Sequence, residues 1–249
     1  MSTFDLPVRF FRGFPAEKPL GFTQQSMHLN VEETALLLVD VYHAAEKPEA
    51  KDLVNSAWDT AFWEIVDDRL VPMIRTAREM KLPVIYVNNS SPRIEILRSS
   101  FGTRLTESLG FDPTRDFKET TVDPIEFDAG ESIQLYIPAQ IAPQPQDYFI
   151  RKHTYSGFYE TRLDSLLRNL GIKNLLVAGF AADVCVLFTI ADAVFRGYQT
   201  ILVRDCTLAA ELPHEVHNFT QTERITLYME TFLGPSTTAA EVRRLECRL

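Results

Sequence analysis

Three side chains that could do chemistry stand where predicted strands end. Asp40 closes one apolar run, Lys152 closes another predicted strand, and Cys185 lies between a third strand and the helix after it. A thiol at a helix N-terminus has its thiolate stabilised by the helix dipole, and the N–H groups of that turn can hold an oxyanion. With Asp40 as the base that takes the thiol proton and Lys152 as added positive charge, the set fits acyl transfer.

Each of these residues also has an ordinary structural role. A cysteine at the start of a buried helix is usually a small hydrophobic residue. An Asp after a strand commonly caps a helix or solvates a loop, and a Lys at a strand end is commonly solvated. Taken singly, the residue types therefore leave catalysis and structure both open.

The chain has three cysteines, Cys185, Cys206 and Cys247, in no CxxC spacing. An odd number cannot pair completely, so a reducing compartment is the simplest interpretation. Cys206 follows a predicted strand and is expected to be a packed thiol, and Cys247 is expected to be incidental.

The elements that must position these side chains alternate between apolar runs and segments with helical spacing. Continuous apolar runs are typical of strands covered on both faces, as in parallel sheets. The predicted strands are 35–40, 84–89, 147–152, 174–179 and 200–205, and the predicted helices are 58–80, 161–171, 184–197, 214–229 and 237–247. This alternation predicts an α/β fold with a doubly wound parallel sheet, whose ligands gather outside the carboxyl ends of the strands.

Two segments fall outside this pattern. Residues 1–33, rich in Pro and Phe, are expected to be an irregular N-terminal extension, followed by a single domain over 34–249. Within that domain, residues 90–147 have weak periodicity and scattered Pro and Gly. A loop-rich insertion of that size is often a lid or a subunit contact.

Composition excludes several classes of partner. A length of 249 residues suits one large α/β domain, and the net charge of −9 argues against nucleic acid. No stretch approaches the ~20 apolar residues of a membrane-spanning helix. Because the N-terminal residues lack the pattern of a signal peptide, we expect a cytoplasmic protein.

Two local patterns together resemble a known family. The run ALLLVD (35–40) and the block GFAADVCV (179–186) are similar to those of the isochorismatase-like cysteine hydrolases. Their recurring pattern is an apolar strand ending in Asp, a Lys near mid-chain and a block G-[apolar]-A-T-x-x-C-V. Here Ala182 stands where Thr is usual. The likeness covers 34–89 and 148–207 well and the insertion poorly.

The resemblance implies a set of roles and a fold. Asp40 would be the base, Lys152 the electrostatic helper and Cys185 the nucleophile. A cis peptide between Phe180 and Ala181 would turn the Ala181 N–H toward an oxyanion beside that of Cys185. It also implies a three-layer αβα, Rossmann-like fold with a parallel sheet of about six strands, and a homo-oligomer, either dimer or tetramer.

Within that family, the stretch KHTYSGFYET (152–161) looks closest to the ureidoacrylate amidohydrolases. Asn89 matches a position that helps to hold the ureido group there, so Asn89 and Tyr155 are expected in the substrate pocket. Tyr155 could equally be a wall residue that never touches ligand. Tyr42 replaces a frequent Gln in the pocket wall. The resemblance thus implies hydrolysis of a C–N bond in a small ureide, carbamoyl or amide substrate through a thioester.

Other functions stay open beside this one. Nicotinamidases carry a metal site built on an Asp-x-His word, and none of the five His of this chain stands in one, so no metal or other cofactor is expected. Isochorismatases cleave a vinyl ether without a nucleophilic cysteine at this point. A non-catalytic relative that serves as a binding or assembly module is the alternative from another class.

Overall fold

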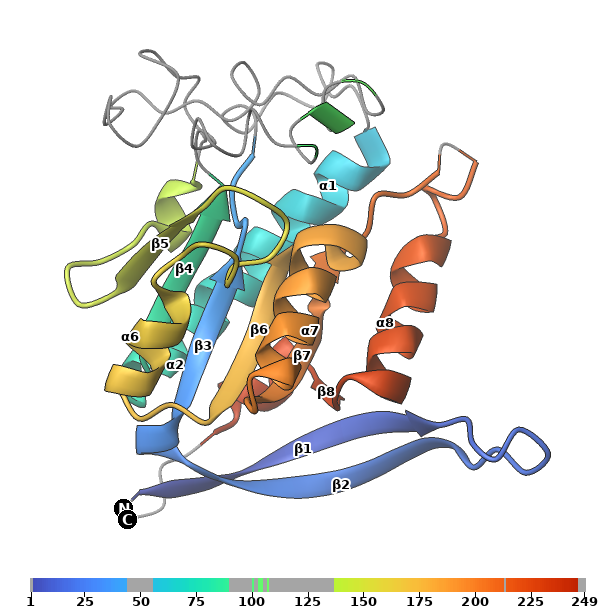
Figure 1. Ribbon diagram of the computed structural model, residues 1–249, viewed down its shortest axis with the longest axis horizontal. Coiled ribbons are helices and arrows are strands. Elements are labelled where there is room, and N and C mark those ends of the chain that lie inside the picture. The colour runs from blue at the N-terminus through green and yellow to red at the C-terminus, as the bar shows by residue number, and fades with distance from the viewer. Residues whose placement is uncertain are drawn as a thin grey trace.

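The computed structural model describes residues 2–43, 56–89, 137–212 and 214–245, together with positions 100, 103, 104 and 107. A single β-sheet runs through this part of the chain. Within those residues its eight strands follow the order β2-β1-β8-β7-β6-β3-β4-β5 (Figure 1). The strands are β1 (Thr3–Arg12), β2 (Gly21–Asn30), β3 (Thr34–Val39), β4 (Val84–Asn89), β5 (Tyr148–Lys152), β6 (Asn174–Phe180), β7 (Gln199–Leu208) and β8 (Ser236–Thr237).

The part of the sheet from β8 to β5 is parallel. These six described strands confirm the predicted fold class, including the parallel sheet of about six strands. All five strands predicted from apolar runs are present within three residues of their expected bounds. The sixth, β8, has only two residues, which is too short for a hydrophobic pattern to reveal.

The prediction that residues 1–33 are irregular was wrong. β1 and β2 pair as a long antiparallel hairpin, and Arg9 of β1 pairs with Ser236 of β8, which joins the hairpin to the sheet. Alternate residues Phe4, Leu6 and Val8 are buried, the two-residue period of a strand. Pro7 obscured this pattern, because proline within an apolar run argues against a central strand. The single-domain assignment for 34–249 stays a prediction.

Helices cover both faces of the sheet. They are α1 (Ser56–Glu64), α2 (Val71–Glu79), α6 (Leu163–Asn169), α7 (Leu187–Phe195), α8 (Thr220–Phe232) and α9 (Ala239–Arg243), with π-helical turns at Ile65–Leu70 and Ala182–Val186 and 3-10 turns at Val31–Glu33 and Ala139–Ile141. Figure 1 shows α6 and α7 on one face and α2 on the other. No helix among the described residues is long and apolar enough to cross a membrane.

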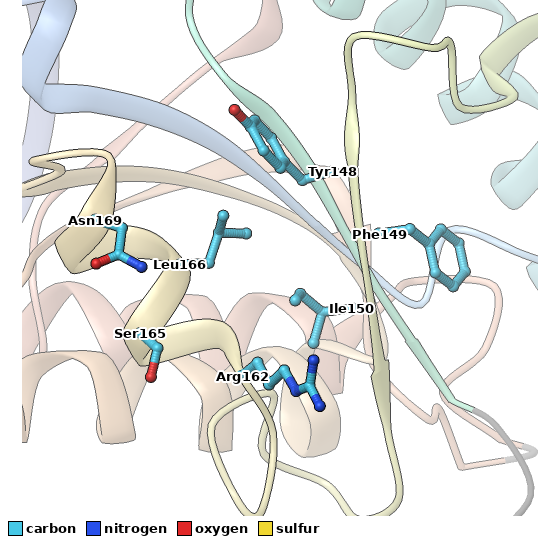
Figure 2. Close-up of a pocket in the computed structure, with 7 residues that line it drawn as sticks. All are labelled: Tyr148, Phe149, Ile150, Arg162, Ser165, Leu166 and Asn169. Carbon is cyan, nitrogen blue, oxygen red and sulfur yellow. The ribbon is translucent and has the colours of Figure 1, made fainter.

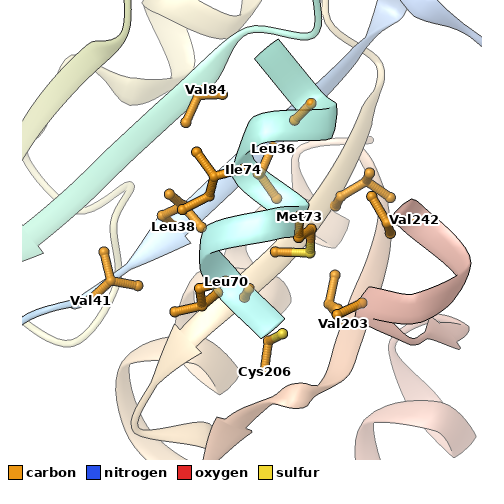
Figure 3. Packing of buried hydrophobic residues seen from close by; sticks show 14 of the residues in the cluster. Leu36, Leu38, Val41, Leu70, Met73, Ile74, Val84, Val203, Cys206 and Val242 are labelled. Atoms are coloured by element: carbon orange, nitrogen blue, oxygen red, sulfur yellow. The ribbon is translucent and has the colours of Figure 1, made fainter. Parts of the chain in front are cut away.

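Two hydrophobic clusters fill the space between the layers. Along β3, Leu36 and Leu38 face the cluster under α1, α2 and α9, while Leu37 and Val39 face the one under α6 and α7. Cys206 packs in the first cluster beside Leu70 and Met73, fully buried (Figure 3). This agrees with its interpretation as a packed thiol. Cys247 lies outside the described residues.

The helix predicted over 214–229 begins later, at Thr220, and ends at Phe232. Phe219, just before it, has a left-handed φ of 50°. The Glu211 carboxylate accepts hydrogen bonds from the backbone N–H groups of Gln221 and Thr222 at 2.9 and 2.7 Å. Those donors would otherwise lack partners in the first turn, so a side chain distant in sequence fixes where α8 starts.

Gly179 brings β6 against β3 at the carboxyl end of the sheet. Its φ is +127°, and a Cβ at this position would lie 1.8 Å from the carbonyl oxygen of Val39. Only a residue without a side chain allows this approach. Because Val39 precedes Asp40 and Gly179 precedes the turn that carries Cys185, this contact sets the spacing of the candidate site.

Replacing Gly179 by alanine is expected to lower the free energy of unfolding by more than about 4 kcal/mol, as measured by urea denaturation. Gly171 is a matched control, since its φ is also positive (+72°) but a Cβ there would meet nothing within 4 Å. Gly171→Ala should cost only the left-handed penalty, about 1–2 kcal/mol. Equal losses in the two variants would show that the contact with Val39 does not matter.

Candidate active site

Asp40 leaves the end of β3 in an unusual backbone conformation. Its φ is 49°, in the left-handed region that few residues other than glycine adopt. The conformation is held by its backbone N–H, which donates to the Val87 carbonyl of β4 at 3.0 Å. The side chain is buried, and Oδ1 accepts from the backbone N–H of Asn89 at 2.7 Å.

Lys152 meets Asp40 below the protein surface. It ends β5, is fully buried, and its Nζ lies 2.7 Å from Asp40 Oδ2. The same Nζ donates to Asn89 Oδ1 and, at 3.1 Å, to the Thr154 carbonyl. A buried ammonium is tolerated only when its charge is paired and its protons are bound, and both conditions hold here. Burial lowers the pKa of Lys152, but the neighbouring Asp40 and Cys185 outweigh it, so the pKa is raised.

Cys185 completes the cluster from the other side. It lies in the π-helical turn after β6, and its Sγ accepts a hydrogen bond from Lys152 Nζ at 3.3 Å. The Asp40 carboxylate also lies near enough to act on the thiol electrostatically. The structure thus brings together Asp40, Lys152 and Cys185, three residues from the ends of three different strands.

The pKa of the Cys185 thiol shifts in the direction opposite to the one expected from the sequence. A helix N-terminus was expected to lower the pKa of Cys185. Burial instead raises the pKa of Cys185 to about 12. The charge of Lys152 lowers this pKa, and the nearby Asp40 carboxylate raises it. The desolvation penalty on a buried thiolate is the largest of these effects. At neutral pH the sulfur therefore keeps its proton, and a base must remove it during attack.

Alkylation should reveal this protonated thiol. Since the thiolate is the reactive form, the rate of iodoacetamide labelling of Cys185 should rise about tenfold per pH unit between pH 7 and 9. Peptide mass spectrometry would follow each cysteine separately, with Cys206, which has no exposed surface, as the internal control. A rate that levels off below pH 8 would mean that the thiol is already ionised and would contradict the raised pKa.

The buried ion pair has a consequence for stability. Lys152→Met leaves the Asp40 carboxylate buried without its cation, which should lower the free energy of unfolding by about 3–5 kcal/mol. Adding Asp40→Asn removes the orphaned charge, so the double variant should recover most of that loss. Urea unfolding of the wild type, the two single variants Lys152→Met and Asp40→Asn, and the double variant gives the comparison. A double variant as unstable as Lys152→Met would show that packing, and not charge, causes the loss.

The turn that carries Cys185 begins with a cis peptide bond between Phe180 and Ala181, the geometry that the resemblance implies. Aromatic rings surround it: the ring of Phe180 lies 4.8 Å from that of Phe62 and 5.9 Å from that of Trp58. The first N–H groups of such a turn have no partner within it and can serve as oxyanion donors.

The expected substrate-binding residues lie around this cluster in different ways. Asn89 Nδ2 donates to Tyr42 Oη at 2.8 Å and to Asp40 Oδ2 at 3.2 Å. Burial and the nearby Asp40 and Cys185 raise the pKa of Tyr42 well above its usual value, so the phenol stays neutral. Tyr155 stacks on Phe188 with ring centroids 5.6 Å apart, and its pKa is raised by burial and by Cys185.

The sequence did not predict that Asn89 links Asp40 and Lys152 through hydrogen bonds. Its backbone and side chain together contact both Asp40 and Lys152. It also missed the Thr154 carbonyl and the contacts of the following loop, where Ser156 donates to Asp192 and the Gly157 N–H donates to Thr189 at 2.9 Å. These contacts fix the loop after Lys152 on α7. Residue spacing gives no signal for any of them.

The remaining expectations concern a metal site and the insertion over 90–147. Among the described residues, no three His, Cys, Asp or Glu side chains gather as metal ligands. His43, next along the chain from the Asp40 region, bonds Asp59 of α1 at 2.9 Å. Most of the insertion over 90–147 lies outside the described residues, so its expected role as a lid or contact stays a prediction.

The chain is similar to known proteins over most of its length. The chain is 29% identical over 221 residues to the ureidoacrylate amidohydrolase of Azorhizobium caulinodans, covering 88% of this chain and 93% of that protein. It is 28% identical to the enzyme of the same name from Acinetobacter baylyi, covering 84% and 82%.

The fold is also similar to those of solved hydrolase structures. A cysteine hydrolase from Pseudomonas syringae pv. phaseolicola superposes with a TM-score of 0.60 at 25% identity, over 87% of this chain and 93% of that one. The N-carbamoylsarcosine amidase of Thermoplasma acidophilum does so with a TM-score of 0.54 at 26% identity, over 83% and 96%. The sequence model of the isochorismatase domain matches residues 34–232. These matches confirm the resemblance seen in the sequence, and the chain belongs to the isochorismatase family of hydrolases.

Proposed function

We propose that this protein is a cysteine-dependent amidohydrolase that cleaves the C–N bond of a small ureide, carbamoyl or amide substrate through a thioester. The observation that carries the proposal is the buried contact of Lys152 Nζ with Asp40 Oδ2 at 2.7 Å and with Cys185 Sγ at 3.3 Å. A nucleophile, a base and a fixed positive charge thus share one site, which is the set that acyl transfer requires.

The first half-reaction forms the thioester. Asp40 takes the proton from Cys185 as the sulfur attacks the carbonyl carbon, and the carbonyl π electrons move to oxygen. The N–H groups of Ala181 and Cys185 hold that oxyanion, and Lys152 offsets the negative charge that grows on sulfur. The C–N bond then breaks, and the departing nitrogen leaves as ammonia or an amine with the proton that Asp40 received.

The second half-reaction restores the thiol. Asp40 removes a proton from water, the water oxygen bonds to the acyl carbon, and the C–S bond breaks. The sulfur recovers the proton from Asp40. Because the pKa of Cys185 is raised to about 12, the thiol is the stable resting form, and Asp40 is needed twice in each cycle.

The names of the relatives support the substrate class. The relatives include ureidoacrylate amidohydrolases and an N-carbamoylsarcosine amidase. The substrates in these names both contain a carbamoyl nitrogen. In this chain, Asn89 and Tyr42 border the cluster with amide and phenol groups suited to a ureido group. Tyr155 would form the wall beside Cys185, with its ring against Phe188.

Ammonia release from the purified protein tests the proposal. The panel is ureidoacrylate, biuret, N-carbamoylsarcosine, nicotinamide and simple amides, with Cys185→Ala as the blank. Carbamate decomposes to ammonia, so one readout covers both leaving groups. Release that requires Cys185 is expected from at least one carbamoyl compound. Silence across the panel from folded protein would contradict this substrate class and would mean another kind of substrate or a fold retained for binding.

Assembly and location stay predictions. We expect a dimer or tetramer, as the resemblance implies, and a cytoplasmic location, as the odd number of cysteines favours. Sedimentation equilibrium would give the number of subunits, and a monomer at micromolar concentration would contradict the expectation.

A further inference from the structure

Glu230 of α8 has a carboxylate oxygen that no described residue contacts through a hydrogen bond. Its side chain is 1% exposed, and Oε1 accepts from Arg9 Nε at 2.9 Å and from Ser236 Oγ. The other oxygen, Oε2, is buried and bonds no group in the described part of the chain. A buried carboxylate oxygen is costly unless it accepts a hydrogen bond, so Glu230 Oε2 suits a ligand that brings an N–H or O–H group.

Arg204 of β7 is a partly buried cation close to this carboxylate. Its Nη1 donates to Ser236 Oγ at 3.1 Å, and it makes no ion pair with the residues that the structure describes. Burial lowers the pKa of Arg204, and the charge of Arg9 lowers it further. Glu230, Asp205 and Glu241 all act electrostatically on Arg204, and Glu230 is also the carboxylate that Arg9 binds, so two guanidinium groups lie beside the Glu230 side chain.

Glu230 and Arg204 both border one cavity of about 500 Å³ between the β1–β2 hairpin, β7 and α8. Phe22 and Leu227 form its apolar wall, and Arg9 stacks on the Phe22 ring at 4.4 Å from its centroid. Glu223 and Arg224, which also line it, are exposed and carry opposite charges.

Arg9 and Phe22 precede residue 34, where the match to the isochorismatase domain begins. This cavity therefore depends on a part of the chain outside the family domain. A second cavity of about 310 Å³, between β5 and α6, is lined by Tyr148, Ile150 and Arg162 among others (Figure 2). It holds no unpartnered buried polar group among the described residues, so nothing comparable recommends it.

We propose that the cavity between the hairpin and α8 binds a small carboxylate that carries a hydroxyl or N–H donor next to its acid group. The carboxylate would lie against Arg9 and Arg204, and the adjacent donor would satisfy Glu230 Oε2. The bidentate fork of a guanidinium suits a carboxylate, and the acceptor selects against acids that lack the donor. This site is separate from Asp40, Lys152 and Cys185, none of which lines the cavity.

Calorimetric titration with malate and succinate tests the proposal, because these acids differ only by one hydroxyl group. Malate should bind at least about tenfold more tightly than succinate, because succinate would leave the acceptor unpaired. Arg204→Gln should weaken malate binding at least about tenfold. Arg12→Gln, an exposed arginine on the same strand as Arg9 that does not line the cavity, should bind malate normally.

Glu230→Gln gives a second reading, since it keeps the shape of the side chain and should abolish the preference for malate. Cys185→Ala should bind malate as the wild type does, so this result is independent of the catalytic proposal. Equal affinities for malate and succinate, no binding of either acid, or malate binding unchanged by Arg204→Gln would each overturn the inference.

Discussion

Replacing Cys185 by alanine is expected to abolish turnover, with kcat at least about 10⁴-fold below that of the wild type. Alanine removes the sulfur that forms the thioester, and no other described nucleophile contacts both Asp40 and Lys152. The fold should persist, because Cys185 lies at the edge of its hydrophobic cluster with 8% of its surface exposed. Steady-state ammonia release measures the loss, and circular dichroism checks the fold.

Cys206→Ala is the matched control. This thiol is also buried, but it packs under α2, away from the cluster of Asp40 and Lys152. Its loss should cost some stability and leave kcat within about twofold. If Cys185→Ala kept more than a tenth of the wild-type rate, the chemistry would not pass through this sulfur.

The second large effect is expected from Asp40→Asn. Asparagine is nearly the same shape but cannot accept the thiol proton, so kcat should fall by about 10³–10⁴-fold. The charge of Asp40 also raises the pKa of Cys185, so its removal should make the thiol easier to ionise. Turnover should therefore fall while iodoacetamide labelling of Cys185 at pH 8 becomes faster.

This opposite response separates a base from a merely structural residue. A variant that had lost its local structure would change both rates through disorder, and the sign of the labelling change would not be fixed. Lys152→Met supplies the reverse case, because the charge of Lys152 lowers the pKa of Cys185 and its loss should slow labelling. Slower labelling in Asp40→Asn, or turnover close to normal, would contradict the role assigned to Asp40.

The sequence predicts the participants of this site better than their contacts. Lys152 ends a strand, Asp40 and Cys185 follow strands, and parallel strands present their carboxyl ends at one edge of the sheet. Their convergence therefore follows from the alternating pattern of strands and helices. The raised pKa of Cys185 does not, because it depends on how completely the folded chain excludes water from the sulfur.

Other features depend on contacts between residues distant in sequence. Asn89 contacts Lys152 across 63 positions of the chain, and Glu230 contacts Arg9 across 221. The hairpin of β1 and β2 was missed because Pro7 lies within its alternating pattern. β8 was missed because it is only two residues long. Strand and helix periodicity depends on neighbours within a few positions. It therefore predicts neither contacts between distant residues nor strands whose pattern is interrupted or very short.

The thioester is the central claim, and rapid quenching followed by intact-mass and peptide mass spectrometry tests it most directly. The protein would be mixed with its best carbamoyl substrate from the ammonia panel and quenched in acid within milliseconds. An adduct confined to the peptide that contains Cys185 is expected, and its mass would show whether ammonia or an amine departs first. Turnover in which the adduct never forms, or forms on another residue, would contradict the mechanism.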